Sequence, residues 1–130
     1  MTASSRSDII GAMMGLLAFE SVVEEVVGSL PDSITERFDN VTIEVAVRPT
    51  REQDPTGTDL LGLYEGISIL ERGVDYYGFT PDRIIIFYQP HMHLGLSGIE
   101  LRDEIRTTVL HEIGHHLGIS DRRLHEIGWG

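Results

Sequence analysis

The stretch HEIGHHLGISD, residues 111–121, carries the most informative pattern in the chain. It contains the motif H-E-x-x-H, in which His111 and His115 are four positions apart. On a helix this spacing places both imidazoles on one face, one turn apart, where they can bind a single Zn²⁺. Glu112 points about 100° away from His111 around the helix axis. The pattern therefore predicts a zinc site on a helix, with Glu112 near a water on the metal but not itself a ligand.

Asp121 is the predicted third zinc ligand, in the extended pattern H-E-x-x-H-x-x-G-x-x-D. On an uninterrupted helix it would lie about 9 Å beyond His115, away from the metal. Gly118 removes this difficulty, because glycine adopts the left-handed conformation that ends a helix and reverses the chain. Three protein ligands leave the fourth zinc position open for water, as in catalytic sites. Glu126 is a rival third ligand, although its spacing of eleven residues from His115 is short for that role.

The composition excludes several classes of chemistry. The 130 residues include ten basic residues, all of them arginine, against 21 acidic ones, which gives a formal net charge of −11. Without lysine there is no Schiff-base or phosphate-loop lysine, and without cysteine there is no disulfide, thiolate nucleophile or cysteine-bound metal. The negative charge argues against nucleic acid and membrane surfaces as partners. The apolar fraction of 41% suits one domain with a hydrophobic core.

Hydrophobic periodicity predicts an α+β fold. We expect an N-terminal helix, a short second helix, a small sheet of about three strands, and a C-terminal active-site helix that carries the zinc motif. The polar residues 49–59, with two prolines, predict a loop. The predicted helices and strands cover residues 8–29, 33–38, 41–47, about 67–70, 83–89 and 99–116.

The apolar run at residues 9–19 is interpreted as the first half of the N-terminal helix. It is too short to span a bilayer. It also continues directly into the acidic helix sequence from Glu20, without a small-residue cleavage site. We therefore expect a cytoplasmic protein. Residues 1–18 would form an N-terminal extension with the start of the first helix, and residues 19–130 a single domain.

Three further stretches add to the zinc motif: LPDSITERFDNVTIEVAVRP (30–49), LLGLYEGISILERG (60–73) and RIIIFYQP (83–90). Together with residues 100–129 they resemble the minimal zincins, a small bacterial family of predicted metallopeptidases, over roughly residues 19–129. The Gly-x-x-Asp ending is similar to metzincin-type peptidases whose third ligand is aspartate. The resemblance implies a zincin-like fold and one Zn²⁺ per chain. It further implies zinc on His111, His115 and Asp121, Glu112 as general base, and a peptide or protein substrate.

Two other functions remain open. Larger metzincins have a methionine-containing turn and a lower subdomain after the third ligand, whereas all four methionines here precede the motif and nine residues follow Asp121. A metal-binding or partner-binding zincin-like domain with weak catalysis fits this shorter sequence. The spacing of His111, His115 and Asp121 is also similar to the His-x₃-His-x₅-His motif of small bacterial ribosomal-RNA endoribonucleases. The acidic charge and the presence of Glu112 argue against that function.

Other polar residues have less specific patterns. His91 and His93 follow a predicted strand and could line the cleft, hold a second metal or lie in a polar loop. His116 fits side-chain packing better than metal binding, because it lies on a different helix face from His115. A tyrosine could stabilise an oxyanion, and the sequence does not select among Tyr64, Tyr76, Tyr77 and Tyr88.

Overall fold

The structure is a computed structural model that describes residues 14–76, 78 and 80–129. It has the predicted α+β fold. The predicted helical residues before residue 14 lie outside the described part. The described elements are, in chain order, α2 (Leu16–Gly28), α3 (Asp32–Thr35), β1 (Val41–Ala46), β2 (Gly62–Glu65), β3 (Asp82–Phe87), α4 (Tyr88–His93), α5 (Gly98–His116) and α6 (Asp121–Glu126).

The three strands form a mixed sheet in the order β1-β3-β2. Ile84 of the central strand β3 lies opposite Ile43 of the parallel β1 and opposite Tyr64 of the antiparallel β2. The central position explains the apolar sequence of β3, because residues 84–87 are at most 1% exposed and both faces of the strand are covered. In the described structure β2 is an edge strand, with no strand on its outer side.

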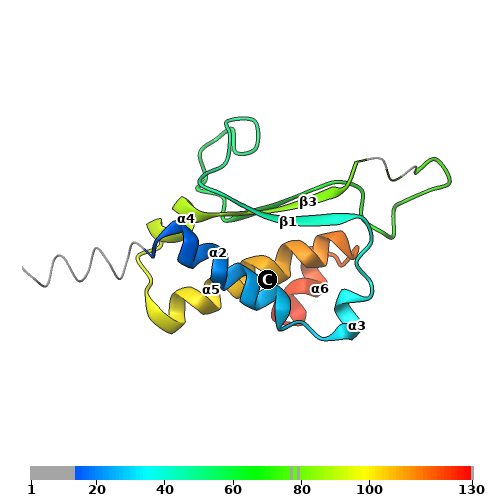
Figure 1. Ribbon diagram of the computed structural model, residues 1–130. Coiled ribbons are helices and arrows are strands. Elements are labelled where there is room, and N and C mark those ends of the chain that lie inside the picture. Colours follow the sequence, from blue (N-terminus) through cyan, green and yellow to red (C-terminus); the bar gives the residue numbers. More distant parts are fainter. Residues whose placement is uncertain (1–13, 77, 79, 130) are drawn as a thin grey trace, which may run out of the picture.

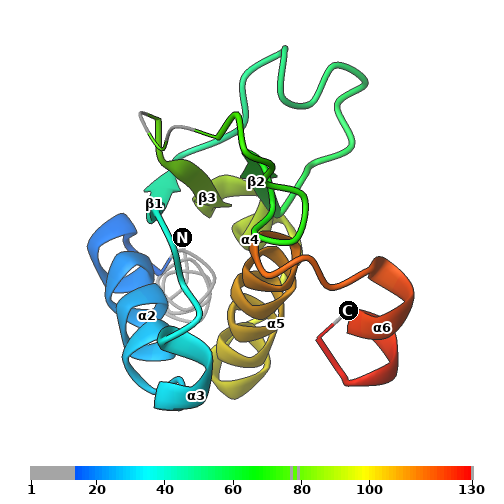
Figure 2. The ribbon, with the colours of Figure 1, turned by 90° about the vertical axis from the view of Figure 1, so that its right-hand side faces the viewer.

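Helices α2 and α5 lie on the same face of the sheet and form a second layer (Figure 1, Figure 2). The hydrophobic core fills the space between the two layers and contains apolar side chains from α2, α5 and β3. Leu101, Ile105, Val109 and Ile113 recur at helical spacing along α5 and are fully buried. The helix that carries the zinc motif is therefore anchored along most of its length.

The predicted second strand is wrong by about five residues. The strand is Gly62–Glu65, and residues 67–70 contain a turn. Gly66 has φ +150°, and a Cβ atom there would lie 2.3 Å from Oδ1 of Asp82. After this glycine the chain turns toward α5, where the N–H of Ile69 donates to the carbonyl of His116 at 3.0 Å.

Three other boundaries differ from the prediction. Met14 and Gly15 are not helical, so α2 begins at Leu16, immediately after a glycine that does not favour helix. α3 ends at Thr35, three residues early. The strand predicted at residues 83–89 stops at residue 87, because the next residues form the short helix α4 with Pro90 in its first turn, where proline is tolerated. β1, the loop at residues 49–59 and α5 are confirmed.

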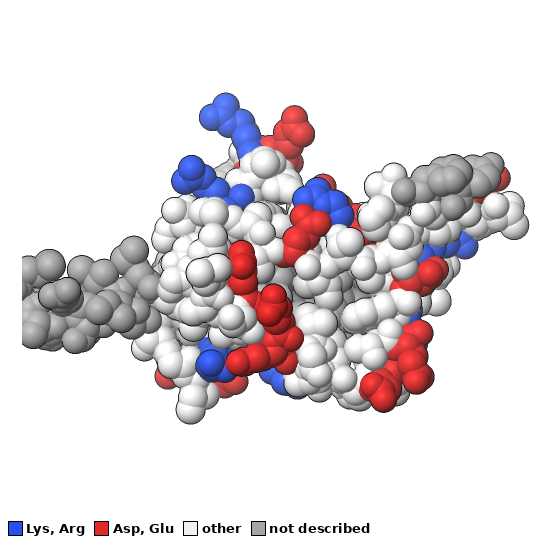
Figure 3. Space-filling view, viewed as in Figure 1, with Lys and Arg blue, Asp and Glu red and all other residues white. Residues whose placement is uncertain are grey.

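The charged surface is mostly acidic, in line with the net charge of −11. On the face seen in Figure 3, acidic side chains form most of the charged surface and arginines stand beside them singly or in small groups. Arg83, for example, pairs with Glu44 at 2.8 Å and with Glu65 at 3.1 Å. Among the described residues, no helix has both the length and the apolar character needed to cross a membrane.

Candidate metal centre

His111 and His115 of α5 lie beside Asp121, the first residue of α6. Nε2 of His115 is 2.8 Å from Oδ1 of Asp121, and Nε2 of His111 is 3.6 Å from the same oxygen. The two imidazole rings are 4.6 Å apart, measured between their centroids. One possible ligand atom from each of the three residues lies within 4.8 Å of the others. The fold therefore brings the three residues predicted as zinc ligands into one cluster.

A glycine turn at the end of α5 places Asp121. Gly118 has φ +80°, and its N–H donates to the carbonyl of His115 at 3.0 Å. The N–H of Ile119 donates to the carbonyl of Gly114 at 2.9 Å. These two hydrogen bonds form a Schellman motif, which ends a helix and turns the chain. The reversal predicted for Gly118 is confirmed, and it brings Asp121 back beside the histidines.

Close packing of α6 against α5 holds Asp121 in this position. A Cβ atom at Gly114 would lie 2.2 Å from Cδ2 of the buried Leu124, so the contact between the helices requires glycine. Ser120 caps α6, because its Oγ accepts a hydrogen bond from the N–H of Arg123 at 3.2 Å. Gly114 occupies a variable position of the zinc motif, and its role becomes evident only in the fold.

The backbone carbonyl of Trp129 orients His111. Nδ1 of His111 lies 3.1 Å from this oxygen, which can only accept, so Nδ1 carries the proton and the lone pair of Nε2 is available to a metal ion. A second Schellman motif brings the carbonyl to this place. Gly128 has φ +81°, its N–H donates to His125, and the N–H of Trp129 donates to Leu124 at 2.8 Å. Sequence analysis missed the contact between His111 and Trp129. The available signal in the sequence is Gly128, which follows the last helix and allows the chain to turn there.

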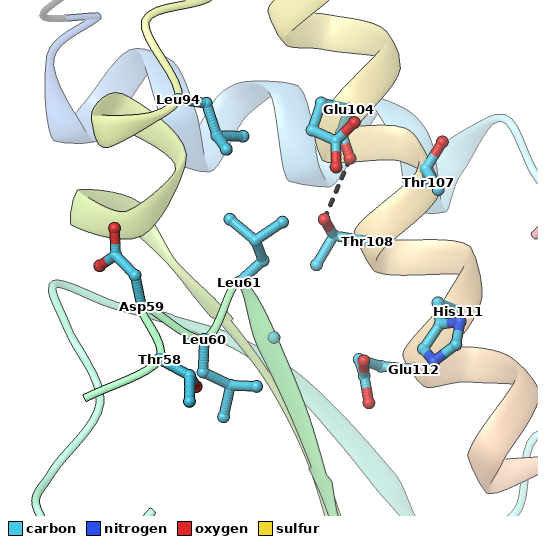
Figure 4. A pocket seen from close by; sticks show the side chains of 11 residues that line it. Thr58, Asp59, Leu60, Leu61, Leu94, Glu104, Thr107, Thr108, His111 and Glu112 are labelled. Carbon is cyan, nitrogen blue, oxygen red and sulfur yellow. Dashed lines mark hydrogen bonds between the residues drawn. The ribbon is translucent and has the colours of Figure 1, made fainter. Parts of the chain in front are cut away.

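Glu112 lines a pocket of about 510 Å³ beside the cluster (Figure 4). Its side chain is only 9% exposed, and Oε1 lies 3.1 Å from Nδ1 of His115. The edge strand β2 approaches α5 closely at Gly62, where a Cβ atom would lie 2.7 Å from Cγ2 of Thr108 and 3.2 Å from Cγ of Glu112. The carboxylate is thus held between α5 and the edge strand.

The carboxylates of Glu112 and Asp121 favour positive charge at the cluster. The pKa of His115 is raised to about 9, chiefly because its imidazolium donates a hydrogen bond to Glu112 and also because it donates one to Asp121; burial acts in the opposite direction. The pKa of Asp121 is lowered, chiefly by its hydrogen bond with His115. The same electrostatic field attracts a metal cation.

The donor set suits zinc. Imidazole nitrogens and a carboxylate oxygen are usual zinc ligands, and two ligand atoms in a tetrahedral zinc site lie roughly 3.4 Å apart. The distances of 2.8 Å and 3.6 Å from Oδ1 of Asp121 to the Nε2 atoms of His115 and His111 lie on either side of that value. Asp121 is therefore close enough to each histidine to share one metal ion with it.

Glu126, the rival third ligand, points to other partners. It forms ion pairs with Arg122 at 3.4 Å and Arg123 at 3.1 Å, all within α6. The described part of the chain contains one group of at least three histidine, aspartate or glutamate residues that are close enough to share a metal. Glu126 is not a member of this group. The geometry therefore favours Asp121 over Glu126.

His91 and His93 do not form a second site. His91 is fully buried, with Nδ1 2.7 Å from the carbonyl of Phe87 and Nε2 2.9 Å from Oγ1 of Thr108. Burial lowers the pKa of His91, so its imidazole is neutral at pH 7. His93 lies at the surface, 2.8 Å from a carboxylate oxygen of Asp59. The polar loop expected here is instead the helix α4, which turns the two side chains apart.

A buried polar network joins the sheet to α5 behind the cluster. Asp82, only 2% exposed, accepts hydrogen bonds from the hydroxyl of Tyr64, from Nδ1 of His116 at 2.9 Å and from Arg72 at 2.9 Å. Nε2 of His116 accepts from the N–H of Asp39 at 3.2 Å, which fixes the proton on Nδ1. The packing role predicted for His116 is confirmed. Sequence analysis did not anticipate Asp82 as the centre of this network.

Tyr64 is the described tyrosine whose ring contacts a histidine of the cluster, with its ring centroid 6.4 Å from that of His115. Its hydroxyl donates to Asp82, and burial together with this carboxylate raises the pKa of Tyr64. Tyr64 therefore supports the fold in this arrangement. The other candidates make hydrogen bonds elsewhere or are not described: Tyr76 with Asn40, Tyr88 with Met14, and Tyr77 outside the described residues.

Comparison with known proteins agrees with this geometry. The sequence model of a family described as zincin-like metallopeptidase matches residues 38–129, more than half of the chain. The match begins at Phe38, later than the expected start at Phe19, and it includes the whole sheet, α5 and α6. No curated protein matches the chain. The extent of the family match shows that the chain belongs to the zincin-like metallopeptidase family.

Proposed function

We propose that the chain is a zinc-dependent metallopeptidase in which His111, His115 and Asp121 hold one zinc ion. The family implies zinc binding and points to a hydrolase. The observation that carries the proposal is the convergence of two Nε2 atoms on Oδ1 of Asp121, next to the carboxylate of Glu112. When bound, zinc acts as a Lewis acid that polarises a carbonyl group and lowers the pKa of a water molecule.

Glu112 is the proposed general base. Its carboxylate lines the pocket, is largely buried, and lies within hydrogen-bond distance of His115. In this role Oε1 takes a proton from the attacking water and later gives it to the nitrogen of the leaving amine, so that the carboxylate is regenerated. Gly62 keeps the edge strand close to this side chain.

The outer edge of β2 is the proposed binding place for an extended peptide or protein substrate. This edge has no strand partner in the described structure. The pocket that includes Glu112 lies at one end of β2, and a second pocket of about 380 Å³, which includes Tyr64 and His115, lies at the other. A peptide that pairs with β2 through main-chain hydrogen bonds would pass the metal cluster between the two pockets. The mostly acidic surface in Figure 3 supports a substrate other than nucleic acid. The cytoplasmic location stays a prediction.

Cleavage of a mixed peptide library by the zinc-loaded chain, followed by mass spectrometry, tests the proposal. We expect cleavage by the parent and none by Glu112→Gln, with one zinc per chain in both. Zinc in both proteins without any cleavage would instead favour the catalytically weak binding domain. Cleavage of ribosomal RNA by the parent and by Glu112→Gln, lost in His111→Ala, would favour the endoribonuclease.

A further inference from the structure

The pocket beside Glu112 combines apolar walls with negative charge. Its lining includes three leucines, Leu60, Leu61 and Leu94. Two acidic residues, Asp59 and Glu104, also belong to its lining. Among the described residues that form the pocket there is no arginine, and its single histidine is a proposed zinc ligand. Such a lining suits a side chain with an aliphatic stem and a positively charged end.

Glu104 is the carboxylate available to such a charge. Asp59 already pairs with His93 at 2.8 Å. Glu104 is half-buried and forms no ion pair with any residue that the structure describes. Two arginines of α5 lie two residues from Glu104. Arg102 pairs with Glu25 of α2 at 2.8 Å, and in the described structure Arg106 forms no ion pair with Glu104. A substrate cation at Glu104 would therefore replace no existing ion pair.

The geometry of α5 sets the length of the substrate side chain that can reach Glu104 in the pocket. Glu104 precedes His111 by seven residues. Seven residues of α-helix advance roughly 10 Å and return to within about 20° of the same face. In Figure 4, Glu104, Thr108 and Glu112 follow one another along α5, and Leu61 and Leu94 come from two other segments around the pocket. A side chain that enters beside the metal cluster must therefore be long to reach Glu104.

We propose that this pocket binds an arginine or lysine side chain of the substrate residue beside the scissile bond, with the charge at Glu104. The aliphatic stem packs against the three leucines. The proposal rests on the proposed function, since the reaction places a substrate residue next to Glu112. Arginine is the better fit, because its guanidinium can donate two parallel hydrogen bonds to one carboxylate.

Three peptide hydroxamates that differ in one side chain beside the chelating group provide the test. The side chain is arginine, citrulline, which has nearly the same shape without the charge, or leucine. Calorimetry with the zinc-loaded parent should show the arginine compound bound about tenfold more tightly than the citrulline compound. Glu104→Gln should bring this ratio close to one. Asp103→Asn, at an exposed position of α5 outside the pocket, should leave the ratio unchanged.

Equal affinities of the parent for the arginine and citrulline compounds would overturn the proposal, as would a ratio that survives Glu104→Gln. A zinc-loaded chain that binds none of the three compounds also contradicts it. The chain could show the expected ratio of affinities and yet fail to cleave the matching arginine peptide. That result would support the pocket and contradict only the proposed peptidase activity.

Discussion

Nδ1 of His111 lies 3.1 Å from the backbone carbonyl oxygen of Trp129, so a residue close to the C-terminus orients the first histidine of the proposed zinc site. The Trp129 side chain packs against the hydrophobic core, which holds this carbonyl in place. Partners that fix the orientation and tautomer of a ligating histidine typically change metal affinity by about 10-fold to 100-fold. The segment after α6 is therefore part of the proposed metal site, although it supplies no ligand.

Gly128→Val tests this contribution. A β-branched residue is strained at φ +81°, so the substitution displaces the carbonyl of Trp129. We expect zinc affinity to fall by about tenfold or more, measured by competition with a chromogenic chelator. Gly73→Val is the matched control, because Gly73 has open space around its Cβ position and no left-handed φ. Equal zinc affinity in Gly128→Val and the parent would show that the carbonyl does not orient His111.

Gly62→Val tests the role of the edge strand β2 separately from zinc binding. The new Cβ would lie 2.7 Å from Cγ2 of Thr108, so β2 must move away from α5 and from Glu112. Because no proposed ligand is touched, zinc content should stay at one per chain while peptide cleavage falls at least about 100-fold. Loss of the zinc, or unchanged cleavage, would contradict the proposed role of this close approach.

The zinc motif could be predicted because helix geometry and glycine conformation act locally. His111 and His115 share a face through their spacing, and Gly118 reverses the chain as expected. The predictions that failed depend on contacts between segments far apart in the sequence. The second strand ends at Gly66 because Asp82 lies against it, and no local pattern reveals that approach. His91 looked like a loop residue because its buried partner Thr108 is 17 residues away.

The Asp82 network should contribute to stability in a pH-dependent way. Burial alone would raise the pKa of Asp82. Hydrogen bonds from Tyr64, His116, the N–H of Ile67 and Arg72 outweigh burial and hold the pKa below its ordinary value of 3.8. The folded-state pKa is lower than the unfolded-state one, so ionised Asp82 stabilises the fold at neutral pH. This contribution is lost as the pH falls below about 4.

Asp82→Asn should therefore lower the free energy of unfolding by roughly 3 kcal/mol at pH 7, because it leaves the buried Arg72 with one carboxylate fewer. The difference from the parent should shrink as the pH falls below about 4. Urea titrations at several pH values measure it. Glu44→Gln breaks the exposed pair with Arg83 and should change stability by less than about 1 kcal/mol. A difference between Asp82→Asn and the parent that stays constant with pH would contradict the ionised state of Asp82.

The central claim is that Asp121, returned by the Gly118 turn, completes the zinc site. The most direct test is the zinc content of Asp121→Ala and Glu126→Ala after dialysis against a weak chelator, measured by elemental analysis beside the parent. We predict that Glu126→Ala keeps about one zinc per chain, because Glu126 pairs only with arginines of α6 in the described structure, and that Asp121→Ala loses most of its zinc. Zinc retained in Asp121→Ala and lost in Glu126→Ala would contradict the account and make Glu126 the third ligand.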